Sequence, residues 1–112
     1  ASIVSENKQL CTPASVDSIS SSNNQEDHVS MGANAATKCL RVIENVERVL
    51  AIELLTAVQA LEYRRPLQSS AVIENVVHAL RQTISFNSAD RVLYTDMHKA
   101  VDFIRCFDVD AL

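Results

Sequence analysis

Turn-forming residues are nearly missing from this chain of 112 residues, which has one glycine and two prolines. Because these residue types end or interrupt helices, their scarcity favours long helices joined by few connections. Apolar residues make up 47% of the chain and charged residues 21%, which is the composition neither of a disordered chain nor of a membrane-spanning one. The sequence therefore predicts an all-α fold in one domain, with no membrane as partner.

Positive charge is also sparse. Lysine and arginine together number 10 against 14 acidic residues, for a formal net charge of −4, and only Arg64 and Arg65 place two cations side by side. A surface that follows a phosphate backbone needs a broad basic patch, so nucleic acid is not an expected partner.

Neither the cysteines nor the histidines have the spacing of a disulfide or metal motif. The three cysteines are odd in number, lack a CxxC pair and follow no hydrophobic leader, which favours reduced structural thiols and a cytoplasmic location. His28, His78 and His98 lie far apart and form no HExxH pattern, so we expect no metal site.

One long stretch of the chain has almost no helix breakers. Residues 28–64 contain no proline and only Gly32, which predicts a long central helix that stops before Pro66. Apolar residues recur along it at spacings of three and four: Ala36, Cys39, Ile43, Val46, Leu50, Leu54, Ala57 and Leu61. This apolar stripe predicts a packed face, and the more apolar second half predicts a place inside a helical bundle.

Two shorter helices are predicted after the long one. The first runs near Ala71–Ile84, with Ser69 or Ser70 as its cap, and the second runs near Thr95–Phe107. The expected buried residues are Ile73, Val76, Val77, Leu80 and Ile84 in the first, and Met97, Val101 and Ile104 in the second. Residues 87–90 between them resemble a short capped turn, which leaves room for a brief helical piece before Tyr94.

Residues 1–24 show no sustained periodicity and contain Pro13 and a dense cluster of serine and asparagine. A globular domain seldom begins with so long an irregular segment unless that segment packs on another part of the structure. We therefore expect residues 1–24 to lie along a missing N-terminal part, and residues 25–112 to form the helical segment.

A group of polar side chains, Asn23 to Glu26, stands just before the long helix. The spacing fits a capping box, in which an asparagine accepts from a helix amide and Glu26 reaches back. The functional alternative is a carboxylate that helix amides keep ionised and aimed into a cleft, where it takes a proton or holds a cationic ring. Spacing favours the cap.

Three stretches carry a family resemblance, namely "PASVDSI" (13–19), "NQEDHVSMG" (24–32) and "RVIENVERVLAIELLTAVQALEYRRPL" (41–67). Together with "DRVLYTDM" (90–97), they resemble the C-terminal part of histidine ammonia-lyases, in the aromatic amino acid lyase family. The resemblance runs nearly end to end. Ser20 to Asn23 depart from it, because the family more often has a Pro-Thr-Ser-Ala type of run there.

The resemblance implies an enzyme that deaminates L-histidine to urocanate and ammonia. Its electrophile is a methylidene-imidazolone ring that forms from an internal Ala-Ser-Gly, a tripeptide that this sequence does not contain. The chain is therefore expected to be a fragment of a helical-bundle lyase and to be inactive alone. The motif places a catalytic pocket carboxylate at Glu26, with Gln25 beside it in substrate binding.

The resemblance also implies a homotetramer with a central bundle of long helices. Two alternatives stay open. One is a tyrosine ammonia-lyase or aminomutase, because such enzymes share much of the motif and the residues that select the ring lie upstream. The other is a helical oligomerisation module without chemistry, for which a long apolar helix is enough.

Overall fold

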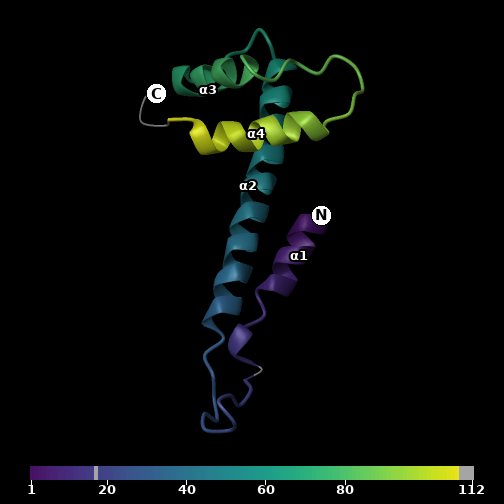
Figure 1. Ribbon diagram of the computed structural model, residues 1–112. Coiled ribbons are helices and arrows are strands. Elements are labelled where there is room, and N and C mark those ends of the chain that lie inside the picture. Colours follow the sequence, from purple (N-terminus) through teal and green to yellow (C-terminus); the bar gives the residue numbers. More distant parts are fainter. Residues whose placement is uncertain (17, 109–112) are drawn as a thin grey trace. The chain divides into compact units, whose positions relative to one another are not determined.

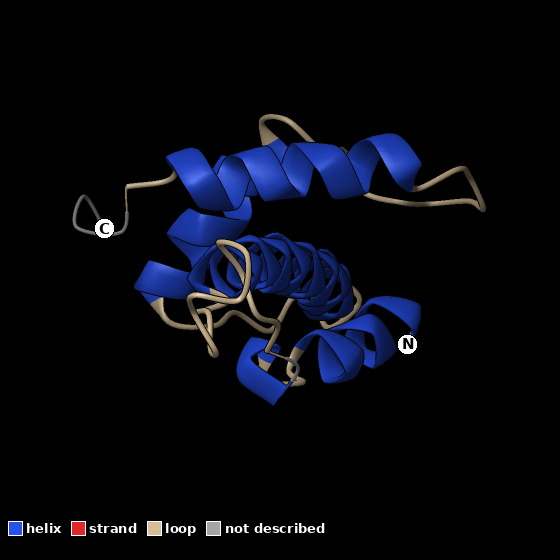
Figure 2. Cartoon of the chain, turned by 60° about the horizontal axis from the view of Figure 1, so that its bottom comes forward, coloured by secondary structure: helices blue, strands red, loops and turns tan. Residues whose placement is uncertain are grey.

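The computed structural model describes residues 1–16 and 18–108, and this part of the chain consists of helices and loops (Figures 1 and 2). The elements in order are α1 (Ser2–Leu10), the 3-10 turn η1 (Ala14–Val16), α2 (Gly32–Glu62), α3 (Ala71–Arg81) and α4 (Tyr94–Cys106). The all-α prediction is confirmed. Asp17 and residues 109–112, which belong to the two segments expected from the sequence, lie outside the described residues.

The chain divides into two compact units, residues 1–46 and residues 47–112. The first contains α1, η1 and the beginning of α2, and the second contains the rest of α2 together with α3 and α4. None of the helices in the described residues is both long enough and apolar enough to cross a membrane.

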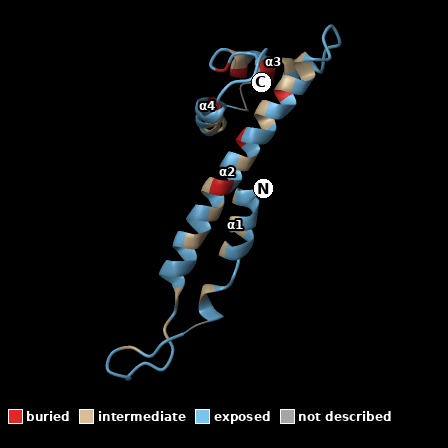
Figure 3. Ribbon diagram, turned by 90° about the vertical axis from the view of Figure 1, so that its right-hand side faces the viewer, coloured by how far each residue is buried: buried red, intermediate tan, exposed pale blue. Residues whose placement is uncertain are grey.

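The second unit has an apolar core. Its buried residues are Ala51, Val58, Val77, Leu80, Ile84 and Ala100, which come from α2, α3, the segment after α3, and α4 (Figure 3). Leu80 and Ile84 are its largest buried apolar side chains, with exposed fractions of 0% and 2%. Complete burial of side chains of this size is worth about 1.5–3 kcal/mol each, so these two anchor α3 to its neighbours.

The ends of α3 carry the caps that its sequence predicts. Ser70 is the N-cap, and its hydroxyl accepts the Ile73 amide at 3.4 Å, as expected for one of the two candidate serines. Glu74, in the first turn, accepts two hydrogen bonds from Arg65 and one from the Ser69 amide. The bonds from Arg65, followed by that from Ser69, lower the pKa of Glu74 below its usual value.

The first unit differs from the irregular segment expected over residues 1–24, because Ser2–Leu10 form α1. This helix has a weak apolar pattern and is held by polar contacts with α2 instead. Asn45, which is 1% exposed, donates to Glu6 and to Asn7 at 2.8 Å, and Arg41 pairs with Glu6 at 3.0 Å. Tertiary hydrogen bonds here outweigh the weak local signal that periodicity detects.

Within the described residues most members of the apolar stripe of α2 are exposed, so its packing inside a helical bundle stays a prediction. Ile43, Val46 and Leu50 are 52%, 43% and 46% exposed, and of the eight stripe residues only Leu54 and Leu61 are half-buried. The buried positions on α2 are Asn45, Ala51 and Val58, none of which belongs to the stripe. Periodicity shows that a face is apolar, but it does not show which element packs there.

Helix boundaries agree with the expectations to within a few residues. The long helix begins at Gly32 rather than His28, and α3 and α4 end earlier than expected. Met97, Val101 and Ile104 are half-buried, while the exposed Ile73 departs from its predicted burial. The described residues between α3 and Tyr94 contain no further helical piece.

Candidate functional site

The segment before α2 folds into a small hairpin, which we call the polar loop (residues 18–31). Ser21 and Glu26 face each other across an antiparallel bridge, with backbone N–O distances of 3.1 and 3.3 Å. The turn between them contains Ser22, Asn23 and Asn24, all with positive φ, at 53°, 56° and 66°. Asparagine tolerates this left-handed region better than most residues, so the sequence fits the turn.

Serine hydroxyls close the polar loop further. Ser18 Oγ accepts the Val29 amide at 3.0 Å and donates to the Val29 carbonyl at 3.3 Å, which joins the two ends of the hairpin. Ser20 Oγ donates to Asn24 Oδ1 at 2.8 Å near the tip. Residues 22–28 are all exposed, so hydrogen bonds rather than apolar packing give this loop its shape.

Glu26 lies on the returning side of this hairpin. Its Oε2 accepts a hydrogen bond from Ser21 Oγ at 3.1 Å, and its Oε1 makes no hydrogen bond within the described residues. The capping-box prediction was wrong, because α2 begins only at Gly32 and the positive φ values of Asn23 and Asn24 exclude a helix start there. Glu26 is therefore held by a hydroxyl group and not by helix amides. Gln25, beside it, is also exposed.

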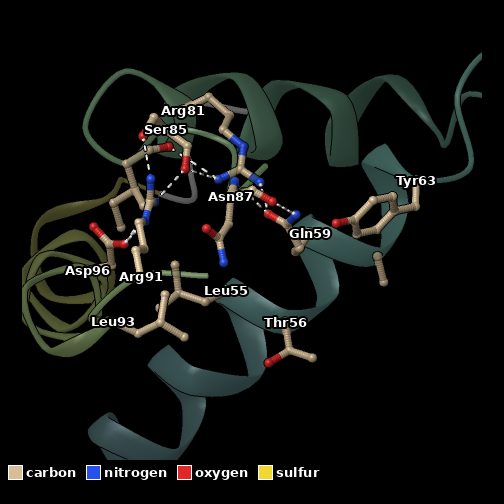
Figure 4. Close-up of a pocket in the computed structure, with 12 residues that line it drawn as sticks. Leu55, Thr56, Gln59, Tyr63, Arg81, Ser85, Asn87, Arg91, Leu93 and Asp96 are labelled. Atoms are coloured by element: carbon tan, nitrogen blue, oxygen red, sulfur yellow. Dashed lines mark hydrogen bonds and ion pairs between the residues drawn. The ribbon is translucent and has the colours of Figure 1, made fainter. Parts of the chain in front are cut away.

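A second candidate site is a pocket of about 330 Å³ in the second unit, between α2, the end of α3 and residues 85–96 (Figure 4). Leu55, Ile84 and Leu93 give it apolar walls. Gln59 holds the backbone of Asn87 on both sides, donating to its carbonyl at 2.9 Å and accepting from its amide at 3.2 Å. The Asn87 Oδ1 atom is buried and has no hydrogen-bond partner in the described part of the chain.

The two arginines of this pocket make structural contacts within the chain. Arg81 donates to Glu62, to Gln59, and to the carbonyls of Ile84 and Ser85. Arg91 pairs with Asp96 and binds Ser85 through its hydroxyl and carbonyl. Each cation is thus paired with a carboxylate of the chain itself. We interpret the residues around the pocket as structural contacts that fix the segment after α3 in place.

The described residues contain no group of three or more histidine, cysteine, aspartate or glutamate side chains arranged to hold a metal ion. The electrophile that the family resemblance implies forms from an Ala-Ser-Gly tripeptide, and the sequence has none. The residues of this chain therefore cannot generate that group.

Comparison with known proteins gives the family of the chain. A family model described as "Aromatic amino acid lyase" matches residues 1–82, which include the whole polar loop and most of α3. The chain belongs to the aromatic amino acid lyase family. The match to the lyase model includes Gln25 and Glu26 but ends before Asn87 and Arg91.

Individual lyases of this family align over nearly the whole chain. The histidine ammonia-lyase of Natranaerobius thermophilus is 52% identical over 93% of this chain and 20% of its own length. That of Bos taurus is 52% identical over 89% of this chain and 15% of its own. The crystal structure of histidine ammonia-lyase from Trypanosoma cruzi superposes with a TM-score of 0.91 at 46% identity, covering 96% of this chain and 21% of that one. The chain thus spans about a fifth of these lyases.

The sequence pattern selected Gln25 and Glu26. It did not indicate Ser21, whose hydroxyl donates a hydrogen bond to the Glu26 carboxylate. The signal was present as the run Ser20-Ser21-Ser22. Three adjacent serines indicate a polar turn, but the pattern does not indicate which hydroxyl faces the carboxylate. That depends on the hairpin register, which the left-handed residues set.

Proposed function

We propose that this chain is part of an ammonia-lyase that converts L-histidine to urocanate and ammonia. The support comes from relatives that bear this name and from one observation in the polar loop. Glu26 is exposed, is anchored through a single oxygen atom to Ser21, and keeps Oε1 open. A carboxylate held in this way can accept a hydrogen bond from an imidazole N–H or take up a proton.

The reaction breaks the bond between Cα and the amino nitrogen of histidine and a C–H bond at the adjacent carbon. A base must take that proton, and the ring must be held in place while it leaves. We assign Glu26 to one of these two tasks and Gln25, whose carboxamide both donates and accepts, to substrate binding. A methylidene-imidazolone ring supplied from outside this chain would withdraw electrons from the substrate amine.

We further propose that the active enzyme is a cytoplasmic homo-oligomer, a tetramer as the resemblance implies. The support for association is the exposed apolar stripe of α2, where Ile43, Val46 and Leu50 lie at helical spacing. Contiguous apolar surface of this kind typically marks an interface. The support for a reducing compartment is that Cys11, Cys39 and Cys106 are all free thiols.

The activity assay compares the 112-residue chain with a longer protein that contains it. We expect the longer protein to form urocanate from histidine, followed by ultraviolet absorbance, and to leave tyrosine unchanged. The chain alone should be inactive with both, because no residue in it can form the electrophile. Turnover of tyrosine but not histidine would assign the other substrate, and turnover by the chain alone would overturn the proposal that it is only a part.

A further inference from the structure

We propose that Ser21 is a positioning residue for Glu26, and that its hydroxyl holds one carboxylate oxygen so that the other faces the substrate. This inference rests on the proposed function, because it assigns a task to the same carboxylate. The Ser21 hydroxyl takes no part in the backbone bridge between the two residues, because that bridge is formed by main-chain atoms alone.

Three hydrogen bonds join Ser21 and Glu26. Two backbone hydrogen bonds join them at 3.1 and 3.3 Å, and the bond from Ser21 Oγ to Glu26 Oε2 adds a third contact at 3.1 Å. Residues opposite each other in an antiparallel bridge have their side chains on the same side, within reach of one another. The short serine side chain therefore meets the carboxylate without any movement of the backbone.

The physical need for such a contact follows from the exposure of Glu26. A glutamate side chain has three rotatable bonds, and on an exposed loop nothing else in the described residues confines its carboxylate. Catalytic groups act efficiently only when they are held close to the productive geometry. A hydrogen bond from Ser21 removes part of this freedom before the substrate binds.

The neighbouring serines supply matched controls. Ser20 donates to Asn24, and Ser18 bonds to Val29, so each supports the loop without touching Glu26. Threonine at position 21 keeps the hydroxyl. Valine has nearly the shape of threonine but lacks the hydroxyl, so the pair Ser21→Thr and Ser21→Val isolates the hydrogen bond from the packing of the side chain.

The experiment measures kcat, KM and the thermal midpoint in the longer active protein. We expect Ser21→Ala and Ser21→Val each to lower kcat about tenfold, which matches the loss of one hydrogen bond to a charged group. Ser21→Thr should restore most of the rate, and Ser20→Ala should leave it unchanged. If Ser21→Val is as fast as Ser21→Thr at equal thermal midpoints, the hydroxyl has no positioning role.

A double-mutant cycle with Glu26→Gln separates positioning from a general effect on the loop. If Ser21 acts through the carboxylate, Ser21→Val should change the rate of the Glu26→Gln enzyme by less than about twofold. An equal tenfold loss in both backgrounds would show that Ser21 only shapes the loop, and would overturn the inference. If Glu26→Gln itself keeps full activity, the assignment of Glu26 in the proposed function fails, whatever Ser21 does.

Discussion

The polar loop and the core of the second unit are held together by different forces. The loop is shaped by serine hydroxyls and three backbone hydrogen bonds, and its residues 22–28 are all exposed. The core depends on close packing, with Leu80 and Ile84 almost completely buried. Packing tolerates little change in volume, whereas a hydrogen-bonded loop tolerates a change of volume but depends on the direction of single bonds.

This difference predicts where substitutions act. A change in the loop should alter the rate of reaction with little effect on stability, because few contacts are lost there. A change in the core should alter stability, because the cavity it leaves cannot refill. The three predictions below test this separation, in order of decreasing size.

Glu26→Gln should have the largest effect. The amide keeps the shape of the side chain and can still accept from Ser21, but it has no charge and cannot take up a proton. We expect kcat for histidine in the longer enzyme to fall about 10²–10⁴-fold, with an unchanged thermal midpoint. Asp27→Asn is the control, since Asp27 is the adjacent exposed acid and should tolerate the change. Comparable losses in both variants would show a general requirement for negative charge.

Leu80→Ala should destabilise the second unit by about 2–5 kcal/mol, as is typical when a buried leucine is truncated. Leu67 is the matched control, because it is the same residue type at 67% exposure, and Leu67→Ala should change stability by less than about 0.5 kcal/mol. Denaturant unfolding followed by circular dichroism measures both. Similar midpoints for the two variants would mean that this core does not determine the stability of the chain.

The smallest effect should come from Glu74, at the edge of the core. Arg65 and the Ser69 amide lower its pKa in the folded chain, so the ionised form is the stabilising one. Its contribution is present above the ordinary pKa of 4.5 and is lost as the pH falls through the lowered folded value. Glu74→Gln should therefore reduce the thermal midpoint slightly at neutral pH, and should match the wild type well below pH 4.5.

Glu53, an exposed carboxylate on α2, provides the control for this titration. Glu53→Gln should leave the thermal midpoint unchanged at either pH, because Glu53 forms no ion pair within the described residues. A difference between wild type and Glu74→Gln that persists in acid would rule out the ion pair as its source.

Local signals in the sequence predicted much of the fold. The break before Pro66 and the cap at Ser70 each depend on a few adjacent residues, and the structure confirms both. The burial pattern of α2 was harder to predict, because Leu50 lies on an apolar face and yet is 46% exposed.

The candidate site was only partly predictable. Gln25 and Glu26 were selected through the family resemblance, and their roles stay predictions. The spacing of Asn23 and Glu26 suggested a helix cap because it ignored the left-handed backbone between them. The hydrogen bond from Ser21 to Glu26 crosses a turn. It depends on the pairing register of the hairpin, which a linear sequence pattern does not encode.

Arg81 restricts the motion of the segment that follows α3. All five of its N–H groups are engaged, and its acceptors lie on α2 and on the segment that follows α3. Release of that segment breaks the two bonds from Arg81 to Ile84 and Ser85 and the two bonds between Gln59 and Asn87. We therefore expect the Asn87 amide, which donates to Gln59, to exchange its hydrogen with solvent as slowly as amides within α3, although it lies in a loop.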